Sequence, residues 1–277
     1  MAETIDTGTP DLLATLDAGV LTLTLNRPEA RNAMSREMNL ALQQQLAAAE
    51  FDAAVKCVML TGAGKGFCAG GDVKGMAARG NAEGGTVGAM TIDEAIHRQR
   101  ANQRATAGKL FKMPKPTLAA LPGAAAGAGL ALALACDLRI MASSAIMTTA
   151  FARVGFSGDY GGTYFLTQLV GSAKARELYF LSERVGADEA HRLGLANWVC
   201  APEDLAARSR EIALRLAKGP TVAYRYMKEN LNRAMAGEVD DCLDLEATHH
   251  IHCGQTEDHR EATLAFVEKR EPVFKGR

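Results

Sequence analysis

Two stretches rich in glycine and alanine constrain the fold of this chain more than any other feature. They are residues 67–72 (FCAGGD) and residues 123–129 (GAAAGAG). Each follows a predicted strand and precedes a predicted helix, where main-chain N–H groups have no partner inside the helix. Small side chains at such a point let another backbone or a ligand come close. One stretch alone is more typical of tight packing, whereas two together are consistent with two N–H groups that bind the same oxygen, an oxyanion hole.

The order of predicted strands and helices indicates an α/β fold. Strands are expected at short apolar runs, and helices where apolar residues recur every three or four positions. The expected strands are residues 20–25, 57–60, 117–121, 138–141 and 145–149, and the expected helices are residues 36–49, 92–112 and 129–136. From residue 161 onwards the pattern is almost wholly helical. We therefore expect an α/β core over residues 1–200 and a helical region over residues 201–277 that packs on the core and on neighbouring subunits.

The composition is that of an ordinary globular protein. The chain has 277 residues, of which 48% are hydrophobic and 23% charged, and its net charge is −1. This charge gives no support for binding nucleic acid or an anionic membrane surface. Residues 1–10 carry no secretory signal, and no apolar run reaches the about 20 residues that span a membrane. Six scattered cysteines without a CxxC pair are typical of reduced thiols, so we expect a cytoplasmic protein.

Motifs along nearly the whole chain are similar to those of one enzyme family. Residues 26–28 (NRP) are followed by residues 31–34 (RNAM), and then both glycine-rich stretches come at the family's spacing. Residues 161–163 (GGT) continue the match, and residues 266–274 resemble the family's C-terminal end. On these residues the chain resembles the enoyl-CoA hydratase/isomerase (crotonase) family.

The resemblance implies a crotonase-type spiral of ββα units with a C-terminal helical trimerisation region, assembled as a homotrimer or a hexamer. It implies an acyl-CoA thioester as substrate and no metal or other cofactor, because coenzyme A is part of the substrate. A histidine-rich cluster, His249, His250, His252 and Cys253, does suggest metal ligands. However, residues one or two apart on a helix point in different directions, so no metal site is expected.

Position by position, the resemblance assigns the oxyanion hole to the N–H groups of Gly71 and Ala128. The main chain that would lie along coenzyme A comprises Ala30, Cys68, Ala69, Gly70, Asp72 and Val73. Arg31 is a candidate phosphate contact, or else a solvated surface residue. The Asp72 side chain has the position of a cap for the following helix. Tyr160 is a candidate for orienting the substrate, or else a packing residue.

The sequence departs from the hydratases of this family at two positions. Where those enzymes carry glutamates, this chain has Ala131 and Phe151. Neither side chain can orient water or supply a proton, so we expect hydration of a C=C bond to be weak. The isomerase branch involved in phenylacetyl-CoA breakdown also has a phenylalanine at the second position. The resemblance to that branch implies that Phe151 lines the acyl pocket.

One carboxylate remains at a matching position. Asp159, within residues 158–162 (GDYGG), resembles the aspartate of Pro-Asp-Ser-Gly-Gly in the same isomerase branch. A single carboxylate can move a proton between two carbons when an enolate is stabilised beside it. Apolar neighbours such as Phe151 and Phe156 would raise its pKa toward the working range. The competing interpretation of a glycine-flanked aspartate is a turn residue.

The favoured function is an enoyl-CoA isomerase that shifts a double bond or opens a ring, with Asp159 as acid and base. The nearest rival is an aroyl-CoA dehalogenase or hydrolase with Asp159 as nucleophile. That branch has a histidine where this chain has residues near Arg104 and a tryptophan in place of Phe151, but the single tryptophan is Trp198. The sequence is also compatible with a weak enoyl-CoA hydratase or a catalytically silent CoA- or RNA-binding relative, although no basic run with interleaved aromatics supports RNA.

Overall fold

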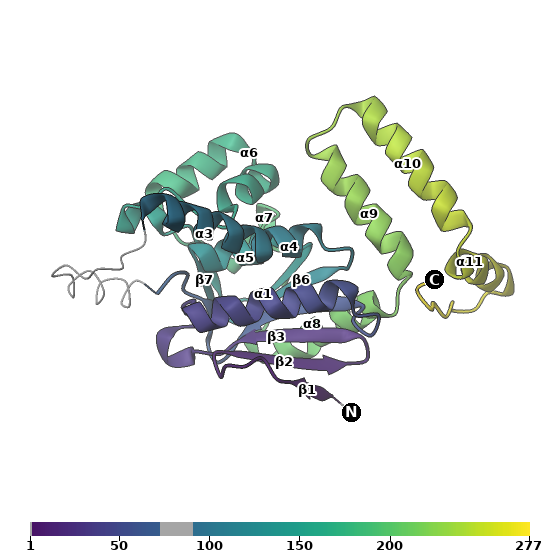
Figure 1. Cartoon of the computed structure of the whole chain (residues 1–277), viewed down its shortest axis with the longest axis horizontal. Helices are drawn as coiled ribbons and strands as arrows, with labels where there is room; N and C mark the ends of the chain where they lie inside the picture. The colour runs from purple at the N-terminus through teal and green to yellow at the C-terminus, as the bar shows by residue number, and fades with distance from the viewer. Residues whose placement is uncertain (1, 73–90) are drawn as a thin grey trace.

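A seven-stranded sheet forms the centre of the protein (Figure 1). The computed structural model describes residues 2–72 and 91–277. The strand order is β1-β2-β3-β4-β6-β8-β11, in which β1 to β3 pair antiparallel and the others pair parallel. The bounds are Glu3–Ile5 (β1), Leu12–Asp17 (β2), Val20–Leu25 (β3), Cys57–Gly62 (β4), Thr117–Leu121 (β6), Leu138–Ala142 (β8) and Trp198–Cys200 (β11).

A second sheet of four short strands contains parts of both glycine-rich stretches. Its order is β10-β9-β7-β5, with bounds Gly66–Cys68 (β5), Ala124–Ala126 (β7), Ile146–Thr148 (β9) and Val185–Gly186 (β10). Each of β4, β6 and β8 is followed along the chain by a strand of this sheet, so the chain winds through repeated pairs of strands. Residues 66–68 and 124–126 are not among the expected strands, but they are strands, because β5 and β7 pair in parallel. Glycine and alanine are depleted in strands, and the two partners are distant in sequence.

Helices pack against the strands, and their caps follow the sequence signals. Ser35 is the N-cap of α1 and accepts a hydrogen bond from the N–H of Met38 at 3.0 Å. The single helix expected over residues 92–112 is wrong: Thr106 has non-helical angles (φ −116°, ψ −89°) and separates α3 from α4. The helical bounds are Pro28–Ala30 (η1), Arg36–Phe51 (α1), Ile92–Ala105 (α3), Ala107–Lys112 (α4), Ala128–Ala135 (α5), Phe151–Val154 (η2), Gly162–Leu181 (α6), Ala187–Arg192 (α7), Pro202–Asp204 (η3), Leu205–Ala217 (α8), Thr221–Ala234 (α9), Val239–Gly254 (α10) and Glu257–Glu268 (α11).

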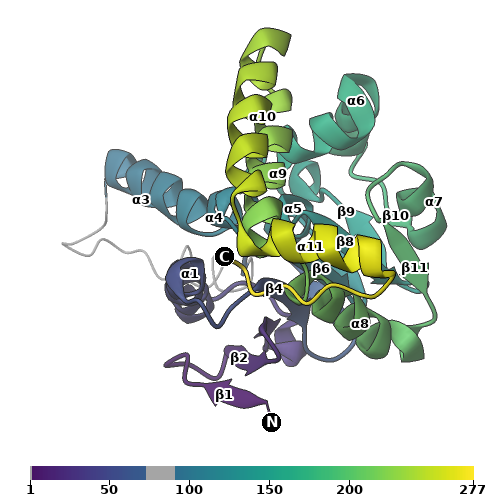
Figure 2. The same cartoon turned by 90° about the vertical axis from the view of Figure 1, so that its right-hand side faces the viewer.

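The helices after residue 201 fall into two groups that pack differently. α8 packs against β3, β4, β6 and β8 of the large sheet, so it belongs to the core. α9 and α10 lie side by side and extend away from both sheets (Figures 1 and 2). The exposed apolar side chains of α9 to α11 include Met227, Leu231, Val239, Leu243, Ile251, Leu264, Phe266 and Val267. Within residues 2–72 and 91–277, no helix has both the length and the apolar character to cross a membrane.

A buried lysine anchors α9 to the core. Lys228 is 7% exposed, and its Nζ donates to the carbonyl oxygens of Leu110 (2.9 Å) and Lys115 (3.2 Å) and to Asp137 Oδ2 (2.8 Å). Asp137 Oδ2 also accepts hydrogen bonds from the N–H and hydroxyl of Thr117, at the start of β6. One ammonium group therefore joins α9 to α4, to the entry of β6 and to the residues after α5.

Replacing Lys228 by methionine tests this anchor. The substitution keeps a long side chain but removes the donor to two carbonyl oxygens and to Asp137. We expect the free energy of unfolding, measured by urea titration, to fall by about 2 kcal/mol. Lys218→Met, at an exposed lysine after α8, is the control and should stay within about 0.5 kcal/mol of the parent. Equal stability of the two variants would contradict the anchor.

Candidate active site

The two glycine-rich stretches meet through their main chains. Gly70 follows β5 and has φ +91°, a conformation that favours glycine. A Cβ atom at Gly70 would lie 2.9 Å from the carbonyl oxygen of Ala126 and 3.4 Å from the nitrogen of Ala128. No side chain fits in that space. The first stretch therefore lies directly against the first residue of α5.

Two main-chain N–H groups are left free where the stretches meet. Ala128 opens α5, and its N–H has no acceptor among the described residues, as is usual for the first turn of a helix. Met34 pairs with this stretch by donating its N–H to the carbonyl oxygen of Gly70 at 2.8 Å. Met34 and Gly71 form a parallel β-bridge that does not use the N–H of Gly71, and no described residue accepts this N–H. The residues assigned to the oxyanion hole thus carry N–H groups available to a ligand.

A buried asparagine holds the start of the first stretch. Asn32 is fully buried, and its Nδ2 donates to the carbonyl oxygens of Ala63 (3.0 Å) and Gly66 (2.8 Å). Its Oδ1 accepts the N–H of Arg27 at 2.9 Å, and Arg27 Nη1 lies 3.4 Å from Asp72 Oδ2. These contacts give a structural reason for the motifs at residues 26–28 and 31–34. The Asp72 carboxylate therefore pairs with Arg27 within the described residues.

The residues expected along coenzyme A lie close together. The N–H of Ala69 donates to the carbonyl oxygen of Arg31 at 3.0 Å, which joins the two segments concerned. Arg31 and Ala69 are exposed, Ala30 and Asp72 are half-buried, and Cys68 and Gly70 are buried. Burial raises the pKa of the Cys68 thiol to about 12, so this thiol stays protonated. Val73, also expected in this group, lies outside the described residues.

Asp159 begins a tight turn that two other helices hold in place. The carbonyl oxygen of Asp159 accepts the N–H of Gly162 at 3.0 Å, and Tyr160 between them has φ +50°. The N–H of Tyr160 donates to Gln103 Oε1 of α3 at 2.6 Å, and its hydroxyl donates to Asn39 Oδ1 of α1 at 3.4 Å. Both helices thus fix the turn. Gln103 and Asn39 were missed in the sequence because only the fold brings them to residue 160.

The Asp159 carboxyl group does not have the hydrogen bond that is typical of an aspartate in a turn. In an aspartate turn the carboxylate accepts an N–H from the following residues. Asp159 Oδ1 is instead buried and has no hydrogen-bond partner in the part of the chain that the structure describes. Desolvation by burial raises the pKa of this carboxyl well above its ordinary value, to about 6. The group is therefore a base that can exchange its proton near neutral pH.

Aromatic rings form one wall of the site. Phe151 is 6% exposed and stacks on Tyr179 of α6 with ring centroids 5.9 Å apart and planes 10° apart. A Cβ atom at Gly127 would lie 3.7 Å from the Phe151 ring, so this ring is next to the start of α5. Phe156, expected as a second apolar neighbour of Asp159, is 58% exposed. Tyr179 completes the aromatic wall beside Phe151, and no sequence pattern marked it.

Ala131 leaves space that the Tyr179 hydroxyl adjoins. Ala131 is 1% exposed on α5. A Cβ atom at Gly162 would lie 2.6 Å from Tyr179 Oη and 3.3 Å from the Ala131 Cβ. The surroundings of the Tyr179 hydroxyl therefore include the small residues Gly162 and Ala131, and neither position that carries glutamate in the hydratases has a carboxylate here.

The histidine-rich cluster lies on α10, in the helical extension. The His249 ring is buried against Tyr226, 4.3 Å between centroids, and its Nδ1 lies 2.5 Å from Asn230 Oδ1. In residues 2–72 and 91–277, no group of three or more histidine, cysteine, aspartate or glutamate side chains is arranged to hold a metal ion. His249 thus packs α10 against α9.

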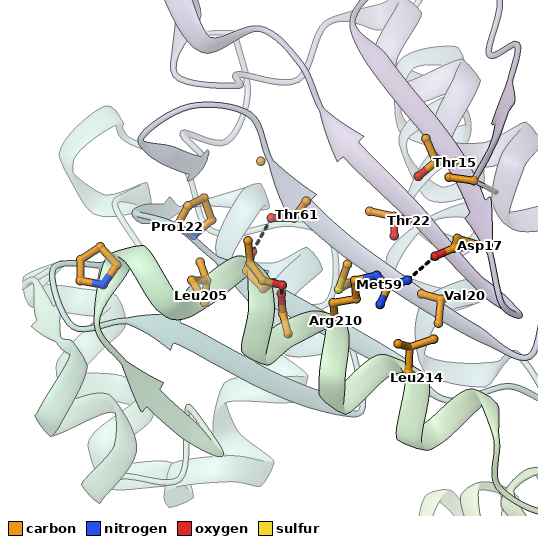
Figure 3. A pocket seen from close by; sticks show the side chains of 16 residues that line it. Thr15, Asp17, Val20, Thr22, Met59, Thr61, Pro122, Leu205, Arg210 and Leu214 are labelled. Carbon is orange, nitrogen blue, oxygen red and sulfur yellow. Dashed lines mark hydrogen bonds and ion pairs between the residues drawn. The ribbon is translucent and has the colours of Figure 1, made fainter.

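A cavity of about 470 Å³ lies elsewhere, between the large sheet and α8 (Figure 3). Its lining includes Met59, Thr61 and Leu205, and Arg210 pairs with Asp17 at its edge. Asp159, Gly71 and Ala128 do not line it. The one carboxylate in its lining, that of Asp17, is paired with Arg210, so the cavity is not part of the site above.

Known proteins match this chain over almost its full length. Residues 15–277 match the family model described as enoyl-CoA hydratase/isomerase. A 1,2-epoxyphenylacetyl-CoA isomerase of Escherichia coli (strain K12) is 36% identical over 266 residues, covering 96% of this chain and 98% of the relative. A short-chain-enoyl-CoA hydratase of Clostridium acetobutylicum is 35% identical over 260 residues, covering 93% of this chain and 95% of the relative. The chain belongs to the enoyl-CoA hydratase/isomerase family.

The fold agrees with that membership. The crystal structure of an enoyl-CoA hydratase from Polaromonas sp. JS666 superimposes with a TM-score of 0.87 at 32% identity, covering 95% of this chain and 99% of the other. The expected crotonase-type α/β fold is therefore confirmed.

The fit of the Tyr179 hydroxyl against Gly162 can be tested by stability. Gly162→Ala would place a Cβ atom 2.6 Å from Tyr179 Oη, and the stacked ring cannot easily move away. We expect a loss of about 1–3 kcal/mol in the free energy of unfolding. In a Tyr179→Phe background the nearest ring carbon would be 3.9 Å away, so most of the loss should disappear. Equal losses in both backgrounds would contradict this geometry.

Proposed function

We propose that this protein is an enoyl-CoA isomerase that moves a double bond, or opens a ring, in an acyl-CoA thioester. One observation carries the proposal: Asp159 has a buried carboxylate oxygen without a partner in the described residues, held on a turn that needs no such oxygen. Ala131 and Phe151 occupy the positions where hydratases of the family carry glutamates. A single base suits proton transfer between carbons better than the addition of water.

The proposed mechanism uses both parts of the site. The thioester oxygen accepts the N–H groups of Gly71 and Ala128, which stabilise the negative charge that forms on it. The Asp159 carboxylate removes a proton from the carbon at one end of the allylic system, giving a dienolate. The same carboxyl then returns a proton to the carbon at the other end, and the double bond shifts. No net proton is gained or lost, and the N-terminus of α5 adds a favourable dipole.

Substrate contacts follow from the positions of the other residues. The main chain of Ala30, Cys68, Ala69, Gly70, Asp72 and Val73 would lie along coenzyme A, with Arg31 near a phosphate. Arg31 is exposed and so free to reach a mobile phosphate group. Phe151 and Tyr160 would bound the acyl group. No metal or separate cofactor takes part in this proposal.

The names of the relatives do not decide between isomerisation and hydration. One relative is named for isomerisation of 1,2-epoxyphenylacetyl-CoA and another for hydration of short-chain enoyl-CoA. Ala131 and Phe151 make the first chemistry the better fit. An aroyl-CoA dehalogenase or hydrolase would use Asp159 as a nucleophile, but Arg104 and Phe151 stand where that branch has histidine and tryptophan. A silent relative would gain nothing from an unpaired buried carboxylate.

We further propose that the protein works in the cytoplasm as a homotrimer or hexamer. The six cysteines are free thiols, which suits a reducing compartment. The exposed apolar side chains of α9 to α11 are candidates for contacts between subunits.

Replacing Asp159 by asparagine tests the base. The variant keeps the shape but loses the proton acceptor, so we expect deuterium exchange into 3-hexenoyl-CoA to slow by about 100- to 10,000-fold. Binding of the thioester should change little, because the N–H groups of Gly71 and Ala128 remain. Asp188→Asn, at an exposed residue of α7, is the control. Unchanged exchange in Asp159→Asn, or a covalent acyl adduct on Asp159 in the parent, would contradict the isomerase.

The raised pKa of Asp159 predicts the pH dependence. Only the ionised carboxylate is a base, so kcat/KM should fall to half near pH 6 as the pH decreases. The stability effect has the opposite sign. The folded protein favours the protonated carboxyl, so the free energy of unfolding falls as the pH rises from 3.8 to about 6 and then levels off. Asp159→Asn should therefore be more stable than the parent at pH 8 but not at pH 3.5. If kcat/KM instead falls to half near pH 4, Asp159 is not desolvated in the working enzyme.

A further inference from the structure

The hydroxyl of Tyr179 lies against both ends of the turn that carries Asp159. A Cβ atom at Gly158 would lie 3.0 Å from the Tyr179 ring and 3.4 Å from its Oη, and one at Gly162 would lie 2.6 Å from Oη. Gly158 precedes Asp159, and Gly162 closes the turn by donating its N–H to the Asp159 carbonyl oxygen. Glycine at both ends leaves the space that the phenol fills. Stacking on Phe151 fixes the direction of the ring.

Two polar groups lie near each other without a hydrogen bond to the described residues. Asp159 Oδ1 is buried and has no partner there. Tyr179 is half-buried, and the influences on its phenol are burial and the charge of Asp159, with no hydrogen bond among them. Burial, and then the charge of Asp159, raise the pKa of Tyr179, so the phenol keeps its proton and remains a donor. Buried polar groups in native proteins are nearly always paired, and exceptions concentrate where chemistry takes place.

The surroundings of Asp159 contain no better donor among the described residues. Its own turn brings the Tyr160 phenol, which already donates to α1. α5 brings the methyl group of Ala131, and the Cys68 thiol at the end of β5 accepts the N–H of Gly70 at 3.5 Å. From α3, Gln103 contacts the turn through its oxygen, while Arg100 and Arg104 line a groove together with Tyr160 and Gly161. Desolvation, and no described cation, accounts for the behaviour of Asp159.

We propose that Tyr179 is a positioning residue, whose hydroxyl donates a hydrogen bond to the ionised Asp159 carboxylate and turns it toward the acyl group. The inference rests on the proposed isomerase function. A carboxylate only accepts hydrogen bonds, so ionisation of Asp159 creates the acceptor that Tyr179 lacks. A neutral phenol stabilises the carboxylate less than a cation would, so Asp159 stays basic enough to take a proton from carbon. The Tyr179 hydroxyl thus provides a polar group beside Ala131, the position where the hydratases carry a glutamate.

Tyr179→Phe removes the hydroxyl and keeps the ring that stacks on Phe151. We expect kcat for deuterium exchange into 3-hexenoyl-CoA to fall by about 10-fold with KM unchanged. The acid limb of the pH–rate profile should move up by about one unit, because the ionised carboxylate has lost a donor. Tyr164→Phe is the matched control: Tyr164 is on the same helix, is 39% exposed and packs edge-on against Phe111. Tyr164→Phe should change neither kcat for deuterium exchange nor the acid limb of the pH–rate profile.

The variants together separate this inference from the proposed function. In Asp159→Asn, adding Tyr179→Phe should cause no further loss, since the two residues act through one carboxylate. A Tyr179→Phe enzyme with the parent's kcat and acid limb, in a protein where Asp159→Asn abolishes exchange, would overturn the inference and leave the function standing. A lower rate with an unmoved limb would also overturn it, because that is the result of a merely structural role. If Asp159→Asn itself exchanges normally, the proposed function fails first.

Discussion

The main-chain contact between the two glycine-rich stretches is the constraint on which the rest of the site depends. A Cβ atom at Gly123 would lie 1.9 Å from the carbonyl oxygen of Lys65, and one at Gly129 would lie 2.5 Å from that of Cys68. No other residue type fits at either point without moving the backbone. This approach pairs β5 with β7, begins α5 at Ala128 and leaves its first N–H beside Gly70. Any larger residue would separate the two N–H groups that we propose stabilise the enolate.

The opposite side of the site is built from helices rather than strands. α3 and α1 hold the Asp159 turn through Gln103 and Asn39, and α6 places Tyr179 against it. The oxyanion side is thus set by backbone atoms, and the base side by side chains from several elements. A proton-transfer site needs such fixed geometry on both sides, because reorganisation during the reaction would cost rate. Variation on the base side can change the chemistry while the thioester is bound in the same way.

The base side carries the departures of this chain from the hydratases. Ala131 and Phe151 remove two carboxylates, and Asp159 remains as one carboxylate in an apolar space. Among residues 2–72 and 91–277, no charged group shifts its pKa, so its basicity is set by desolvation. A second carboxylate would have coupled to it and divided the titration between two groups. The single buried acid is therefore suited to taking a proton and returning it near neutral pH.

The sequence by itself determined the alternation of strands and helices, the small residues at the two main-chain contacts and the loss of both glutamates. These depend on local chemistry: apolar periodicity, glycine where φ is positive, and side chains that cannot carry a proton. Only the tertiary structure decided that residues 66–68 and 124–126 are strands, since each needs a partner far away in the chain. It also decided that Phe156 is largely exposed and that Tyr179 and Gln103 contact the turn that carries Asp159. Which side chains share a space depends on how α3 and α6 pack, and no local pattern encodes that packing.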